Sequence, residues 1–103
     1  MPFMMRIPGQ SGEVHTAVQV LGNTLRVAIL RELAAGPATR AAISAALGVT
    51  EQSLSRQIAL LEEKGVVSTE VLPGRGRPTR HHLQTARLEQ LERALTSYLH
   101  SRR

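Results

Sequence analysis

The chain of 103 residues is long enough for one domain with a small hydrophobic core. It contains no cysteine, which excludes disulfides, thiolate metal ligands and a cysteine nucleophile, and suits a reducing cytoplasm. Its net charge of +5, from 13 Lys and Arg against 8 acidic residues, predicts a polyanionic partner, and no apolar run approaches the roughly 20 residues that a membrane span needs.

The first segment, residues 1–12, contains two prolines and two glycines without periodicity, and we expect a flexible N-terminal arm. It lacks the basic and apolar regions of a secretory signal. From Glu13 onward a helical pattern begins, and Gly22-Asn23 interrupts it. The apolar residues of this pattern are Val14, Ala17, Val18 and Leu21.

The next three segments are also predicted to be helices. Thr24 is the expected N-cap of the first, which ends before Gly36-Pro37. Thr39 opens a short second helix, and Thr50 caps a third that ends at Gly65. Their apolar faces are Leu25, Ile29 and Leu33, then Ile43, Ala46 and Leu47, and then Leu54, Ile58 and Leu61.

The pattern then changes to that of β-strands. Residues 66–72 are rich in β-branched side chains, residues 73–78 hold the Pro and Gly of a loop, and residues 79–84 return as a second strand. The last segment, residues 86–100, is helical, with apolar residues in a narrow stripe at Leu88, Leu91, Leu95 and Tyr98. Such a stripe is typical of a coiled-coil-like seam rather than of the broad face of a core helix.

This order of elements predicts a mainly α-helical winged helix-turn-helix domain over residues 13–103, with a two-stranded β-hairpin as the wing. In this arrangement the second helix of the helix-turn-helix enters the major groove of DNA, which is about 12 Å wide. The polar face at the start of that helix carries side chains that can read base edges, at Gln52, Ser53, Ser55, Arg56 and Gln57. We therefore expect these five residues, on a recognition helix of about residues 51–64, to contact DNA.

The wing is expected to add a second contact. No acidic residue occurs between Val71 and Leu88, whereas four arginines do, and a solvated charged loop normally mixes both signs. The glycine between Arg75 and Arg77 lets the backbone approach DNA closely. We expect Arg75, Arg77 and Arg80 to enter the minor groove or to bind phosphates.

Three stretches resemble the ArsR-type regulators. The first runs from Leu21 to Leu30, the second from Ala45 to Val67 around the expected recognition helix, and the third from Gly76 to Leu83 is also similar to the wings of MarR- and PadR-like proteins. The resemblance implies a dimeric transcription regulator that binds a near-palindromic operator. Many ArsR-type proteins sense metals through cysteines or clustered acids and histidines, and because this chain lacks Cys and Asp, we expect no metal and no cofactor.

The C-terminal helix is the expected dimerisation element. Its stripe is predicted to pack on a second copy of the chain, since two-fold operators require two-fold proteins. The alternative is that the helix folds back on its own domain. The predicted dimer contacts are Leu88, Leu91, Leu95 and Tyr98, together with Val14 and Val18 from the first helix.

Other functions fit the sequence less well. There is no Gly-x-Ser-x-Gly elbow, no Asp to orient a histidine and no phosphate-binding loop, so an enzyme is not expected. His81 and His82 are adjacent on a strand and point to opposite faces, so they cannot chelate one ion together. A surface or interface position is the expected interpretation of each, although a phosphate contact beside Arg80 stays open. The predicted function is a cytoplasmic DNA-binding repressor, and the alternatives are a protein-interaction module or a DNA-binding accessory factor of a mobile element.

Overall fold

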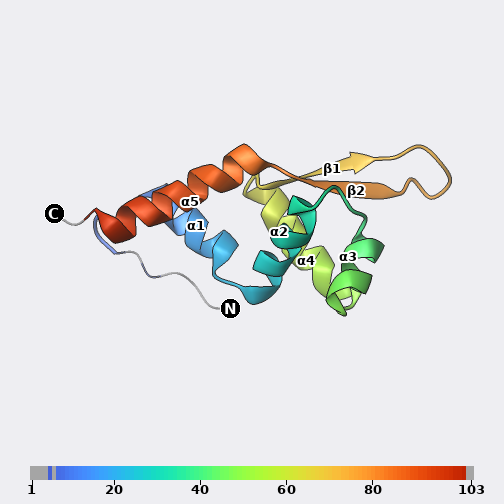
Figure 1. Cartoon of the computed structure of the whole chain (residues 1–103), viewed down its shortest axis with the longest axis horizontal. Coiled ribbons are helices and arrows are strands. Elements are labelled where there is room, and N and C mark those ends of the chain that lie inside the picture. The colour runs from blue at the N-terminus through green and yellow to red at the C-terminus, as the bar shows by residue number, and fades with distance from the viewer. Residues whose placement is uncertain (1–4, 6, 102–103) are drawn as a thin grey trace.

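The computed structural model describes residue 5 and residues 7–101. The remaining residues of the expected N-terminal arm, 1–4 and 6, lie outside the described part, so the predicted flexibility of the arm stays a prediction. The elements follow the predicted order, and Figure 1 shows them. They are α1 (Gly12–Leu21), α2 (Thr24–Ala34), α3 (Arg40–Leu47), α4 (Glu51–Glu63), β1 (Val67–Val71), β2 (Thr79–Leu83) and α5 (Thr85–His100).

Short polar side chains set where the first four helices begin. Ser11, Thr39 and Thr50 each accept a hydrogen bond from the backbone N–H three residues further on, which satisfies a donor that the first turn leaves free. The predicted cap of α2 is wrong by one position. Asn23 is the N-cap, because its side-chain oxygen accepts from the N–H of Arg26 at 3.0 Å, and Thr24 is already helical.

One continuous hydrophobic core joins all five helices to the sheet. The predicted face of α4 is buried in it, as are Ile29 and Leu33 of α2, while Leu25 is half-buried. Ile29, Leu54 and Leu61 are fully enclosed. Two helices differ in detail. In α1 Val20 is buried together with the predicted Val14 and Ala17, while Val18 is 41% exposed. In α3 the expected apolar residue Ala46 is exposed.

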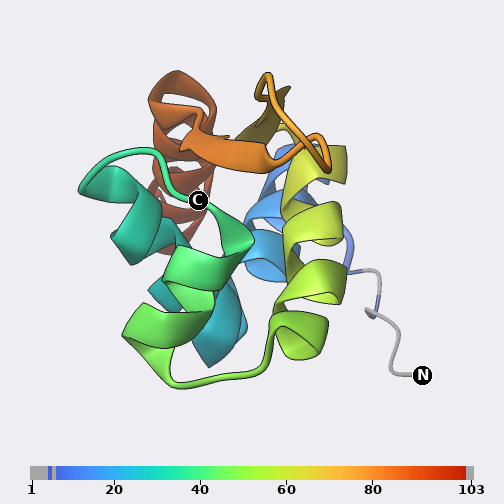
Figure 2. The same cartoon turned by 90° about the vertical axis from the view of Figure 1, so that its right-hand side faces the viewer.

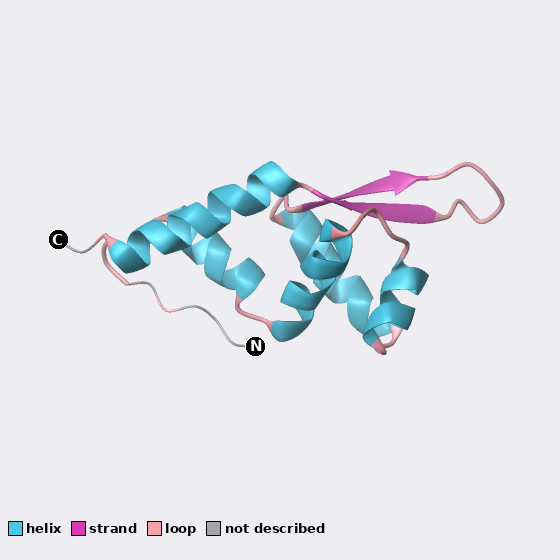
Figure 3. Ribbon diagram, in the orientation of Figure 1, coloured by secondary structure: helices cyan, strands magenta, loops and turns pink. Residues whose placement is uncertain are grey.

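The hairpin is a regular antiparallel pair whose strands lie beside the helices, while the loop that joins the strands projects beyond them, as Figure 3 shows. Its register places Glu70 opposite Arg80 and Thr69 opposite His81. A single bridge adds Ala38 to the sheet, because Ala38 and His81 exchange two backbone hydrogen bonds of 2.8 and 3.1 Å. Since Ala38 directly precedes the N-cap of α3, this bridge fixes the start of the helix-turn-helix to the wing.

The stripe on α5 packs at least in part within its own chain, which is the alternative that the sequence left open. α5 packs along α1 of the same chain (Figure 1), Leu91 is fully buried in the core, and Leu88 and Leu95 pack against it. Val14 on α1 is also buried. Leu91 and Val14 therefore belong to the chain's own core and are corrected as dimer contacts, because almost no surface of either is left for a partner.

Arg87 connects three helices at the inner end of α5. Its guanidinium donates to both carboxylate oxygens of Glu13 at 2.8 and 3.1 Å, and its Nε donates to the carbonyl oxygen of Lys64 at the end of α4. The hydrogen bond from Arg87 lowers the pKa of Glu13 from its ordinary value. The contact joins α1 and α5 to the C-terminal end of α4.

None of the described helices is both long and apolar enough to cross a membrane.

Candidate nucleic-acid interface

The turn between α3 and α4 orients α4 so that the polar face at its start is exposed to solvent. Gly48 adopts a left-handed conformation with φ of 68°, which a glycine reaches without steric cost, and its N–H donates to the carbonyl oxygen of Ser44 at 2.9 Å. The Ser44 hydroxyl donates to the carbonyl oxygen of Val49. These bonds close α3 and turn the chain within three residues, so that α4 begins at Glu51.

The start of α4 presents the side chains that the sequence predicts. Leu54, Ile58 and Leu61 hold one face of the helix on the core. The opposite face leaves Gln52, Ser53, Ser55 and Arg56 exposed and Gln57 half-buried. A hollow of about 410 Å³ lies on this face, lined by Leu25, Thr50, Gln52, Ser53, Arg56 and Gln57. The surface is polar and accessible, as base reading requires.

Two residues of this face are hydrogen-bonded to arginines from other helices. Arg26 of α2 donates to Gln57 Oε1 at 2.7 Å, and Arg40 of α3 donates to Ser55 Oγ at 2.7 Å. Arg40 also lies 3.6 Å from a carboxylate oxygen of Glu51. Both arginines were missed in the sequence analysis. Each lies near the start of its helix, and only the packing of these helices against α4 brings the side chains to the polar face.

The tip of the wing exposes Arg75 and Arg77 on a tight turn. The N–H of Arg77 donates to the carbonyl oxygen of Gly74 at 3.3 Å, and Leu72 and Pro78 close the loop through a 2.7 Å hydrogen bond. Arg77 has a φ of 47°, a left-handed conformation that costs a non-glycine residue on the order of 1 kcal/mol. Both arginines are exposed and form no ion pair with another described residue.

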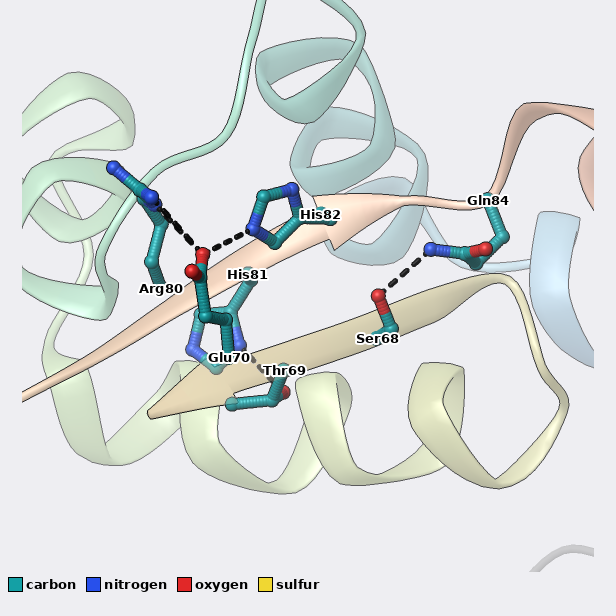
Figure 4. Close-up of polar contacts among 7 residues, drawn as sticks. All are labelled: Ser68, Thr69, Glu70, Arg80, His81, His82 and Gln84. Atoms are coloured by element: carbon teal, nitrogen blue, oxygen red, sulfur yellow. Dashed lines mark hydrogen bonds and ion pairs between the residues drawn. The ribbon is translucent and has the colours of Figure 1, made fainter. Parts of the chain in front are cut away.

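Arg80, unlike Arg75 and Arg77, is paired with an acidic side chain. Figure 4 shows its guanidinium and the ring of His82 on either side of the Glu70 carboxylate, at 3.0 and 2.8 Å. These hydrogen bonds, first that of His82 and then that of Arg80, lower the pKa of Glu70. The acid-free stretch therefore yields fewer free cations than its sequence suggests, because Glu70 faces Arg80 across the hairpin and Glu13 faces Arg87.

The two adjacent histidines point to opposite faces, as predicted, but His81 is buried rather than on the surface. Its Nδ1 lies 2.9 Å from Thr69 Oγ1 (Figure 4), and the Thr69 hydroxyl donates to Glu62 of α4. These contacts connect the wing to α4. Burial lowers the pKa of His81, which favours its neutral form.

The predicted recognition helix and the wing project from the same end of the molecule. In Figure 1 the hairpin tip, α3 and the start of α4 lie at the right of the 55 Å long axis, and the α1–α5 pair lies at the left. Figure 2 looks onto the right-hand end and shows the hairpin above α3 and α4. The two elements that carry the exposed polar and basic side chains are thus next to each other.

Within residue 5 and residues 7–101, no three side chains of the His, Cys, Asp or Glu type come together as a metal site.

Comparisons with known proteins agree with this geometry. A family model described as a helix-turn-helix domain matches residues 21–70, and a search of curated proteins finds no match. The fold is similar to that of an ArsR-like transcriptional regulator from Rhodococcus sp. RHA1, at 22% identity and a TM-score of 0.71 over 86% of this chain and 81% of that one.

Two further structures are similar. HlyU from Vibrio cholerae N16961 has 21% identity and a TM-score of 0.66, over 93% of this chain and 100% of that one. A transcriptional regulator homologue from Pyrococcus horikoshii OT3 has 25% identity and a TM-score of 0.65, over 86% and 92%. The chain has the winged helix-turn-helix fold, as the order of its elements predicts. Among the similar structures, this is the fold of an ArsR-like regulator, the type of protein that the sequence resembles.

Proposed function

We propose that the chain is a sequence-specific regulator that binds double-stranded DNA as a homodimer and represses transcription in the cytoplasm. In this proposal α4 enters the major groove, and the wing contacts the minor groove or the backbone. One observation carries it: the exposed polar face of α4 and the exposed Arg75 and Arg77 lie at the same end of the molecule. The wing arginines supply affinity through phosphates, and the α4 face supplies discrimination.

The homodimer is supported by apolar surface at the opposite end of the molecule. Val18 on α1 is 41% exposed, and Tyr98 and Leu99 on α5 are 39% and 58% exposed. Of the six residues predicted as dimer contacts, Val18 and Tyr98 keep most of the free surface, while Leu88 and Leu95 are half-buried in the chain's own core. Pairing through this end leaves both DNA-facing ends free for the two half-sites of an operator.

A gel shift with random duplex DNA at low salt tests the proposed function. Electrostatic attraction predicts non-specific binding with a Kd in the range of about 1–100 µM at physiological salt, and tighter binding at low salt. Complete absence of a shift at low salt would contradict the proposal and favour a protein-interaction module, in which the wing arginines meet an acidic protein surface. An Arg93→Ala variant, altered on α5 away from the DNA-facing end, should shift the duplex like the unaltered protein.

A further inference from the structure

Two of the predicted base-reading residues are already hydrogen-bonded by side chains from outside the recognition helix. Gln57 accepts from Arg26 of α2, and Ser55 accepts from Arg40 of α3, each at 2.7 Å. Neither arginine belongs to α4 or to the wing. These bonds therefore act on the DNA-facing surface from neighbouring helices.

The bond from Arg26 fixes how the amide of Gln57 is turned. A guanidinium has donors only, so the Gln57 atom that faces it must be the oxygen, which leaves both N–H groups of the amide uncommitted. Both side chains are half-buried, which restricts their alternative rotamers. Gln57 consequently presents donors, and a guanine edge, with its N7 and O6 acceptors, is the base edge that matches two donors.

The bond from Arg40 has the opposite effect on Ser55. The Ser55 hydroxyl donates its only proton to the carbonyl oxygen of Glu51 at 3.2 Å and accepts from Arg40, so one lone pair remains for a ligand. Arg40 is itself held by Glu51, at 3.6 Å. Ser55 in this state accepts and does not donate, which matches the exocyclic amino groups of cytosine or adenine.

From these contacts we propose that Arg26 and Arg40 are positioning residues that determine base specificity, acting through Gln57 and Ser55. This inference rests on the proposed function, and adds to it which hydrogen-bonding groups the α4 face offers. Arg26 makes Gln57 a donor to a guanine-type edge, and Arg40 makes Ser55 an acceptor from an amino group.

The test measures base preference with a randomised duplex library and then Kd values on single-base variants of the selected site. Arg40 is half exposed, so Arg40→Ala should fold. We expect Arg40→Ala and Ser55→Ala to reduce discrimination at the same base pair by about tenfold each, with no further loss in the double variant. Arg40→Lys, which keeps a donor and the charge, should restore the preference, and Arg93→Ala should leave it unchanged.

The same comparison applies to the second pair. Arg26→Met and Gln57→Ala should change the preference at one shared base pair, different from that of Ser55. Thermal melting tests whether the Arg26 variant is folded. If Arg26→Met does not fold, Arg26→Lys compared with Gln57→Ala tests the same bond.

Three results would overturn the inference. If Arg40→Ala weakens all duplexes equally and lowers the salt dependence by about one counterion, Arg40 is a phosphate ligand only. If the losses from Arg40→Ala and Ser55→Ala add, the two residues act separately. If the unaltered protein binds no duplex, both the proposed function and this inference fail. The first two results overturn only the inference and leave the proposed function standing.

Discussion

Single polar side chains decide both where the helices begin and which groups face solvent, and only the first of these can be read from the sequence. The caps at Thr39 and Thr50 are predictable because the bond reaches three residues along the chain. The partners of Gln57 and Arg80 are not, since Arg26 and Glu70 are 31 and 10 residues away. Such contacts depend on how helices and strands pack. The sequence therefore predicts which face of α4 is exposed but not which of its side chains are already hydrogen-bonded.

At this scale the clearest prediction concerns Arg56. It is exposed at the start of α4, and no other described residue forms an ion pair with it. Arg56→Ala should cost about 1–3 kcal/mol of binding free energy on the selected site and relax the preference at one base pair. Competition binding with single-base variants measures this. An equal loss on every duplex would show that Arg56 reads no base.

At the scale of elements, the sequence predicts the order and type of every helix and strand but not what α5 packs on. Its stripe has the spacing of a coiled-coil seam, yet the partner is α1 of the same chain, with Leu91 fully buried. A narrow stripe on one helix cannot distinguish an intramolecular neighbour from an intermolecular one, because both require the same apolar side chains. The hairpin, by contrast, follows from a loop of Pro and Gly between two strand-like segments.

The wing is predicted to act as an electrostatic clamp. A double variant, Arg75→Ala with Arg77→Gly, removes both tip cations, and glycine tolerates the left-handed backbone at position 77. Binding to all duplexes should weaken similarly, and the slope of log K against log salt should flatten by about 0.9 for each phosphate that the variant no longer neutralises. Fluorescence titrations at several salt concentrations measure the slope. An unchanged slope would mean that the wing does not touch DNA.

At the scale of the whole molecule, the long axis separates two surfaces. One end holds α3, α4 and the hairpin, and the other holds the α1–α5 pair with its remaining apolar surface (Figure 1). Arg87 connects the two ends through Glu13 and the last turn of α4. The sequence predicts a polar, basic surface on α4 and the wing and an apolar surface on α1 and α5. Where these two surfaces lie relative to each other depends on the packing of α1 against α5, which brings Glu13 and Arg87 together.

The proposed dimer makes a specific prediction about the α1–α5 end. The unaltered chain should have twice the mass of the 11.2 kDa protomer by light scattering, and Val18→Glu with Tyr98→Glu should be monomeric, because charge burial in an apolar interface is costly. Val27→Glu on α2, where the valine is 44% exposed, is the matched control and should stay dimeric. A monomeric unaltered protein at the concentrations that bind DNA would contradict the homodimer.

One end of the molecule, formed by the start of α4 and the tip of the wing, is the surface that we propose to bind DNA. Backbone amide NMR shifts recorded during titration with a duplex test this most directly, since they report each segment separately. We predict the largest changes at residues 51–57 and 74–78, and small changes at the outer face of α5. Changes confined to α1 and α5, with both of those segments unaffected, would contradict the proposal.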